Sequence, residues 1–333
     1  RNFTNNGGSG ALATASGRWL VYSASPASDL TGSLSNSFRR FSCTYGGSCP
    51  AIPTMGNGFL YSTTPVITVT PNALSSIVYG AVAPTLAGYA YTLSGYLGSD
   101  AGVDGVSGTL NGSTTYTQGA SVNNYALNYQ SGALASTMGY GFSYVNNTSA
   151  ITVTPRLLTV TADIKTKTYG AVDPGLTYQI TTGSLYNTDA FTGALSRAVG
   201  ETVAGGPYAI GQNTLSAGSN YTVTYVGNNL SITRAALTVT ADAQTKVYGS
   251  ADPALTFANS GLVNGDTVSI FSGALSRAVG ENVAGVPYAI SQNTLSAGNN
   301  YTVTYVGNNL SITRAALTVT ANAQTKVYGS ADP

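Results

Sequence analysis

The chain repeats its own sequence at a period of 80 residues, and this repeat limits what it can fold into more than any other feature. Residues 193–253 align without gaps with residues 273–333, and both segments end in TKVYGSADP. Near-identical units of this length fold as tandem modules that mainly contact their neighbours. The sequence therefore predicts a series of small modules. The aligned positions that differ are Thr202/Asn282, Gly206/Val286, Gly211/Ser291, Ser219/Asn299 and Asp242/Asn322.

More diverged copies extend the repeat toward the N-terminus. LLTVTADIKTKTYGAVDP begins at Leu157, and ITVTPNALSSIVYGAVAP begins at Ile67. Residues 1–65 have no copy and are expected to be the end of a preceding β-rich domain. Because the first residue is Arg1 and the last repeat is broken, we expect the chain to be an excerpt from a longer protein. The predicted modules are a degenerate one at 66–155, full ones at 156–234 and 235–314, and the start of another at 315–333.

Within a module, alternating residues predict β-strands. In LTVTA, Leu237, Val239 and Ala241 fall on one face of an extended strand, and the threonines between them fall on the other. No segment has a convincing helical period, although LVNGDTVSIF is compatible with one short helical turn. ADPALTF predicts a turn that leads into another short strand. The fold class is therefore mostly β.

The stretch YTVTYVGNNLSIT predicts a β-hairpin. Two β-branched runs flank Gly-Asn-Asn at 307–309, and these residue types tolerate the positive φ of a tight turn. Tyr301, Val303 and Tyr305 should line one face of the first run.

The joint between modules is short. Arg234, Ala235 and Ala236 are all that separate the last predicted strand of one module from the first of the next. A single module of this size buries only about 60–65% of its unfolded surface, so neighbours should help to stabilise it. We expect small β-rich modules in an elongated array with little flexibility at the joints.

Composition excludes some classes of partner. Charged residues make up 8% of the chain and the net charge is +1, which leaves no field to attract nucleic acid or anionic lipid. No apolar run approaches the length that spans a bilayer. We therefore predict no nucleic-acid partner and no membrane insertion.

The two cysteines are a disulfide candidate. Cys43 and Cys49 lie in CTYGGSC, where a bridge would close a small loop, and a pair of unlinked thiols is the alternative. The chain contains no histidine, which makes a zinc site unfavourable.

An enzyme is not predicted. Without histidine the chain lacks the usual base for a serine or cysteine nucleophile. Glu201 and Glu281 occupy matching positions, but each module holds one glutamate, whereas glycoside cleavage normally needs two carboxyl groups. The simpler interpretation is a solvated carboxylate in a turn. No cofactor is predicted.

Two pairs of aspartates are weak candidates for a calcium site. Asp163 with Asp173, and Asp242 with Asp252, recur ten residues apart near a module boundary, and hard cations prefer several oxygen ligands. The alternative is structural, with Asp252 capping the turn at its proline and Asp242 ending a strand.

Tyrosines offer a possible sugar-binding surface. Aromatic faces stack on sugar rings, but tyrosine also packs well inside sheets. Tyr208 and Tyr288 each follow a proline in a predicted loop, so these two are the candidates for exposure and ligand contact.

The whole repeat resembles the bacterial MBG domain of the YGX type. The Tyr-Gly-X step occurs at 79–81, 169–171, 248–250 and 328–330, followed by Asp-Pro or Ala-Pro and preceded by the LTVTA-type opening. The resemblance covers about residues 66–333, and the first copy departs from it at Ala83. Residues 1–65, with GRWLVYSASPASDLTG and GNGFLYS, resemble the stretch after the passenger domain of filamentous-haemagglutinin-like exoproteins.

The resemblance implies a secreted or surface-attached adhesin of a Gram-negative bacterium, exported through an outer-membrane secretion partner. The modules would then be small β-grasp-like or sandwich-like units. They would form a stalk that contacts mainly its own neighbouring repeats and projects a binding region located elsewhere. The alternative is a glycan-binding array, in which the repeats themselves bind mucin, matrix or other host or environmental surface glycans.

Overall fold

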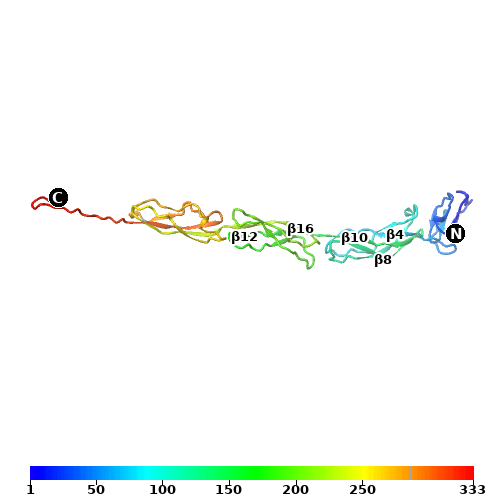
Figure 1. The fold of residues 1–333 in the computed structure, drawn as a ribbon. Coiled ribbons are helices and arrows are strands. Elements are labelled where there is room, and N and C mark those ends of the chain that lie inside the picture. The colour runs from blue at the N-terminus through cyan, green and yellow to red at the C-terminus, as the bar shows by residue number, and fades with distance from the viewer. Residues whose placement is uncertain (286) are drawn as a thin grey trace. The chain divides into compact units, whose positions relative to one another are not determined.

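The computed structural model describes residues 1–285 and 287–333, and strands make up nearly all of its regular structure (Figure 1). The predicted fold class, tandem β-rich modules, is confirmed. The chain divides into two compact units: residues 1–158, 182–191 and 217–223 form one, and residues 159–181, 192–216 and 224–333 form the other. Among the described residues, no helix has the length and apolar character needed to cross a membrane.

The N-terminal segment contains a small parallel sheet. Both outer strands pair in parallel with the central one in the order β1-β3-β2. Trp19, Phe41 and Phe59 are buried here in one core with Ile67 and Met138 of the following module. The segment therefore packs directly on the first module. Its elements are β1 (Leu20–Ser23), η1 (Pro26–Ser28), β2 (Phe38–Arg40) and β3 (Gly58–Tyr61).

The first module consists of a three-stranded and a four-stranded sheet. Their strand orders are β6-β4-β9 and β5-β10-β8-β7. Figure 1 shows β4, β8 and β10 together in this module. The elements are β4 (Val66–Pro71), β5 (Ile77–Val78), β6 (Tyr91–Ser94), η2 (Asp100–Gly102), β7 (Val106–Thr114), β8 (Asn124–Ser136), β9 (Gly141–Tyr144) and β10 (Asn147–Thr154).

The next two repeats have the same two sheets. The orders are β13-β11-β16 with β12-β17-β15-β14, and then β20-β18-β23 with β19-β24-β22-β21. The second repeat contains β11 (Arg156–Ala162), β12 (Lys165–Thr168), β13 (Tyr178–Thr182), β14 (Ser196–Arg197), β15 (Tyr208–Gly211), β16 (Tyr221–Val226) and β17 (Asn228–Thr233). The third contains β18 (Ala235–Ala241), β19 (Gln244–Val247), β20 (Phe257–Ser260), η3 (Val268–Ile270), β21 (Ser276–Arg277), η4 (Val283–Gly285), β22 (Tyr288–Ser291), β23 (Tyr301–Val306) and β24 (Asn308–Thr313).

The alternating pattern of LTVTA produces the expected strand. Leu237, Val239 and Ala241 of β18 are at most 1% exposed. β18 pairs antiparallel with β20 and parallel with β23, so it is the central strand of its sheet. The predicted helical turn is also present, as η3. Residues 315–333 have almost the same sequence as 235–253, but they form no strand and are exposed.

The predicted hairpin in YTVTYVGNNLSIT is wrong, although the face formed by Tyr301, Val303 and Tyr305 is as expected. β23 belongs to the three-stranded sheet and β24 to the four-stranded sheet. Residues 307–309, all described, have no positive φ. The chain crosses between sheets at Gly307, where a Cβ would lie 3.2 Å from the carbonyl oxygen of Ile290. Glycine is favoured because the backbone passes close to β22, not because a turn is needed.

The joint between the second and third modules is shorter than predicted. β17 ends at Thr233 and β18 begins at Ala235, so Arg234 alone separates them. The Arg234 guanidinium donates to the carbonyl oxygen of Asn299 at 3.0 Å, and the Ala235 N–H donates to the carbonyl oxygen of Asn300 at 2.9 Å. Both Arg234 and the first residue of β18 are thus hydrogen-bonded to the segment just before β23 of the third module.

Candidate functional site: the junctions between modules

The tyrosine of the Tyr-Gly-X step is buried where one module meets the next. Tyr169 follows β12, and its N–H donates to the carbonyl oxygen of Thr233 at 2.8 Å, which holds its backbone beside the end of β17. The ring lies edge-on against Tyr301 of the third module, with centroids 5.4 Å apart at 79°. Tyr79 makes the same contact with Tyr221, at 5.5 Å and 77°. Both Tyr79 and Tyr169 are only 5% exposed.

One carboxylate joins the two tyrosines at each junction. The hydroxyls of Tyr169 and Tyr301 donate to Asp266 Oδ2 at 3.0 and 2.7 Å. In the same way, Tyr79 and Tyr221 donate to Asp189 Oδ2 at 3.0 and 2.6 Å. Burial, together with the hydrogen bond to Asp189, raises the pKa of Tyr221 to about 12. The hydroxyl therefore stays protonated and remains a donor throughout the neutral range.

The glycine of the Tyr-Gly-X step is required for two reasons, its backbone conformation and the close approach of the next module. Gly170 has φ +78°, a conformation that side chains rarely adopt, and a Cβ there would lie 2.5 Å from Val263 Cγ2 of the next module. Gly80 has φ +83°, and its Cβ would lie 2.5 Å from the ring of Tyr186. The step therefore combines a buried ring with a backbone that the next module approaches closely.

An asparagine completes each junction. Asn300 Oδ1 accepts the backbone N–H of Val203 at 3.0 Å, and Asn220 Oδ1 accepts that of Val122 at 2.9 Å. Asn300 also accepts the N–H of Ala235 through its own carbonyl oxygen. One residue therefore bonds the preceding module through its side chain and the joint through its backbone.

The apolar core also extends across the junction between the second and third modules. One continuous cluster contains Leu230 and Ile232 of the second module together with Leu237, Leu295 and Tyr301 of the third. Burial is therefore shared between successive modules.

A ring of four charges lies beside the junction. Lys167, on edge strand β12, contacts Asp173 at 2.6 Å and Glu201 at 2.5 Å. Arg197, on the opposite edge strand β14, contacts Asp173 through Nε at 2.6 Å and also pairs with Glu201. Lys167 is only 7% exposed, so both of its anionic partners are needed to compensate for its burial.

The third module has the same ring. Lys246 contacts Asp252 and Glu281, each at 2.5 Å, and Arg277 Nε contacts Asp252 at 2.8 Å while Arg277 also pairs with Glu281. In the first module the position of the lysine holds Ile77. The ring connects the turn after the Tyr-Gly-X step to the segment that includes Val203 in the second module or Val283 in the third. We infer that it holds together the two parts of the surface on which the next module packs.

The ring makes stability depend on acid pH. Hydrogen bonds from Arg197, then Lys167, lower the pKa of Asp173 from 3.8 to about 2, and Arg277, then Lys246, do the same for Asp252. Because these pKa values are lowered in the folded state, their stabilisation is complete above about pH 4 and is lost as the pH falls toward 2. We expect the melting temperature, followed by circular dichroism, to fall over this interval. The fall should be modest, since the Asp173 side chain is 41% exposed and water screens the pairs.

A double variant provides the control. Asp173→Asn with Asp252→Asn should melt at a lower temperature at pH 7 and lose less stability between pH 4 and 2. An unchanged acid dependence in this variant would show that other carboxyl groups cause the loss.

The four calcium candidates have other partners. Asp163 and Asp242 accept the hydroxyls of Thr177 and Thr256, and their N–H groups donate to the carbonyl oxygens of the same two threonines. Asp173 and Asp252 belong to the charge rings. The described residues contain no group of three or more histidine, cysteine, aspartate or glutamate side chains that could hold a metal ion.

Calcium should therefore not change stability. We expect the chain to melt at the same temperature in millimolar Ca²⁺ as in EDTA. If the Ca²⁺ concentration were about 100 times the Kd of a site, binding would add about 2.7 kcal/mol to the free energy of unfolding. For a module of this size, the melting temperature would rise by roughly 10 °C. A rise of that size would restore the calcium interpretation.

The predicted exposure of Tyr208 and Tyr288 is wrong. They are 6% and 7% exposed at the start of β15 and β22. The Tyr208 hydroxyl donates to the carbonyl oxygen of Thr202 at 2.8 Å, and the Arg197 guanidinium lies 5.4 Å from its ring centroid. The proline before each tyrosine precedes a buried strand, so neither ring is available to stack on a sugar.

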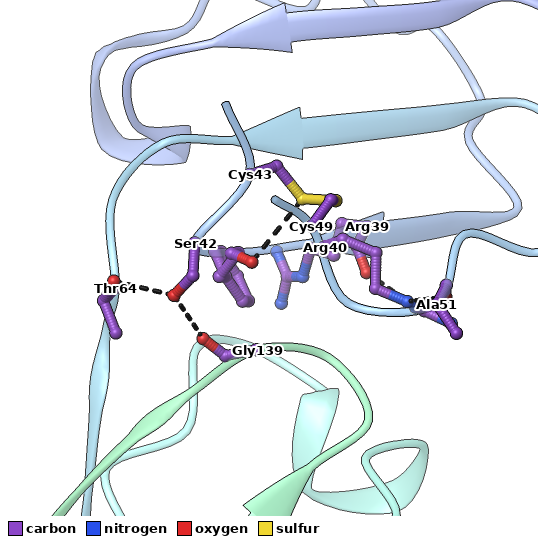
Figure 2. The surroundings of a disulfide bond; sticks show 9 residues. Arg39, Arg40, Ser42, Cys43, Cys49, Ala51, Thr64 and Gly139 are labelled. Carbon is purple, nitrogen blue, oxygen red and sulfur yellow. Dashed lines mark hydrogen bonds between the residues drawn. A yellow bond between two sulfur atoms is a disulfide. The ribbon is translucent and has the colours of Figure 1, made fainter. Parts of the chain in front are cut away.

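Cys43 and Cys49 form a disulfide near the contact between the N-terminal segment and the first module (Figure 2). Their Cα atoms are 4.2 Å apart. Beside the bridge, the Ser42 hydroxyl lies 2.7 Å from Thr64 Oγ1 and donates to the carbonyl oxygen of Gly139 at 2.9 Å. The loop thus lies where the two regions are hydrogen-bonded.

Sequence reasoning found the Tyr-Gly-X step but not its role, and it missed Asp189, Asp266 and the charge rings. A signal for the rings was present, because Lys246, Asp252, Arg277 and Glu281 all have counterparts in the preceding repeat. Because the chain has few charged residues, opposite charges at equivalent positions of two successive repeats were a reason to expect ion pairs.

Two tandem segments match the sequence model of the MBG domain (YGX type): residues 158–231 and residues 237–311. The matches lie within the second and third repeats and support the MBG-type repeat expected from the Tyr-Gly-X steps. No curated protein matches the chain.

Proposed function

We propose that these tandem MBG-type repeats are structural modules of a secreted or surface-attached bacterial adhesin, and that they project a binding region located elsewhere in the protein. MBG repeats occur in surface proteins, which agrees with this role. The observation that carries the proposal is the repeated junction. The same ring, carboxylate, glycine and asparagine contacts recur at Tyr79 and Tyr169, so one module is built to be joined to the next.

The structure suits a load-carrying repeat better than a ligand-binding one. The polar groups at each junction bond to the neighbouring module, and the cores are shared across junctions. The two tyrosines expected to contact glycans are buried. Export through an outer-membrane secretion partner is part of the proposal and depends on the resemblance of residues 1–65 alone.

The test removes one repeat from the surface protein that carries this chain. Deleting residues 235–314 joins Arg234 to Ala315, which reproduces the native Arg-Ala-Ala joint. We expect the shortened protein to be displayed in normal amounts and adhesion to fall in proportion to lost reach, measured by counting attached cells. The unchanged chain should bind mucin and glycan arrays no better than an unrelated β-rich protein.

Two results would contradict this role. Loss of all adhesion by a displayed, protease-resistant deletion variant would make the repeats the binding surface. Specific binding of the chain to a mucin or glycan would support the glycan-binding alternative instead.

A further inference from the structure

The end of the third module carries the same surface that the second module uses to bind its neighbour, but here the surface is uncovered. Tyr248 occupies the position of Tyr79 and Tyr169, yet it is 52% exposed where they are 5% exposed. A Cβ on Gly249 would meet nothing within 4 Å, whereas on Gly170 it would meet the next module. The identical step therefore lacks only its partner.

The uncovered surface is already in its binding geometry. The Tyr248 N–H donates to the carbonyl oxygen of Thr313 at 2.8 Å, as Tyr169 does to Thr233, and Gly249 has φ +83° beside +78° at Gly170. The charge ring around Lys246 is complete, and Lys246 is 7% exposed, the same as Lys167. Binding would therefore require little rearrangement, which favours affinity.

The surface is also hollowed and mostly apolar. A depression of about 690 Å³ is lined on one side by Tyr248, Asn282, Val283 and Ala284. Residues 314–317, which lead into the next repeat, line its other side. Tyr288, Leu310 and Ile312 beneath it form a small separate cluster. Their counterparts Tyr208, Leu230 and Ile232 belong to the large core that continues into the next module.

We propose that this surface, defined by Tyr248, Gly249 and Val283, is a docking site for the three-stranded end of another module of the same repeat type. The partner's chemistry follows from the two occupied junctions. It must supply a tyrosine to meet the Tyr248 ring, an aspartate to accept the Tyr248 hydroxyl, and an asparagine amide oxygen to accept the Val283 N–H. Its first strand would be residues 315–321, which are identical to residues 235–241.

The site depends on the tandem-repeat part of the proposed function and not on adhesion. A glycan or an unrelated protein would not reproduce a dependence on Gly249 and on the aspartate of the docking module.

The experiment lengthens the chain and measures the exposure of Tyr248. A copy of residues 254–314 is added after Pro333, so that residues 315–333 and the copy together complete a fourth module. Tyr328→Phe in all proteins makes the Tyr248 peptide unique in mass. The probe is nitration by tetranitromethane, with the modified tyrosines located by mass spectrometry.

In the 333-residue chain, Tyr248 should be nitrated readily and Tyr169 should resist. In the lengthened chain we expect Tyr248 to react roughly tenfold more slowly, in line with the exposures of 52% and 5%, and to match Tyr169. Two variants of the lengthened chain should restore fast nitration: Gly249→Ala, which places a methyl group against the copied Val263, and Asp266→Ala in the copy alone.

The proposal is overturned if Tyr248 reacts at its original rate while circular dichroism shows that the copy has folded. It is equally overturned if the copy, with the sequence of the third module, does not fold on this surface. Neither result bears on adhesion by the parent protein, which the deletion of 235–314 tests separately.

Discussion

Replacing Tyr169 by alanine should lower the free energy of unfolding by about 3–5 kcal/mol, the cost typical of truncating a fully buried aromatic side chain. The ring is 5% exposed, and it packs on Tyr301 while its hydroxyl bonds Asp266. The matched control is Tyr248→Ala at the equivalent position of the next repeat, where the residue is 52% exposed, and this change should cost about 1 kcal/mol. Urea unfolding followed by circular dichroism would measure both.

Tyr169→Phe separates the hydroxyl from the ring. It should cost about 1 kcal/mol, because Asp266 keeps its bond to Tyr301. Equal costs for Tyr169→Ala and Tyr248→Ala would mean that the Tyr169 ring does not couple the second module to the third.

Gly170→Ala should destabilise the chain by about 2–5 kcal/mol, although only one methyl group is added. Positive φ accounts for about 1–2 kcal/mol, and overpacking against Val263 for about 1–3 kcal/mol more. Gly249→Ala has the same backbone conformation but open space around it, so it should cost only about 1–2 kcal/mol. The difference between the two variants, measured by urea unfolding, isolates the contact between modules.

A further substitution tests the cause of that difference. Val263→Ala in the Gly170→Ala background should recover part of the loss, since it removes the atoms that the new methyl group meets. Lack of any recovery would assign the whole effect to the backbone.

Local patterns predicted the strands but not how they pair. In LTVTA, apolar and polar residues alternate because one face of the strand is buried and the other is not, and a short segment is enough to show this pattern. The residues around Gly307 have the composition of a hairpin turn, yet β23 and β24 lie in different sheets. Which sheet a strand joins is decided by partners far away in sequence, here β18 for one strand and β19 and β22 for the other. A short window of sequence does not contain that information.

The site was harder to predict for the same reason. Tyr169 and Asp266 are 97 residues apart, and only the packing of two modules brings them together. A tyrosine-glycine pair in a strand-rich repeat is compatible with an ordinary turn, and the role of its glycine depends on Val263 of the next module. Tyr208 and Tyr288 show the opposite error, because a proline suggested a loop where a buried strand begins.

The parallel pairing within each module determines how it would respond to tension. In the third module, β18 pairs in parallel with β23 from Ala235 to Thr240, and β19 pairs in parallel with β24. A pull on Ala235 and on Thr313 draws the paired strands in opposite directions along their length, so the hydrogen bonds between them are sheared together instead of opening one after another. A module loaded in this way resists force through many bonds at once, and its lifetime under load is set by its unfolding rate.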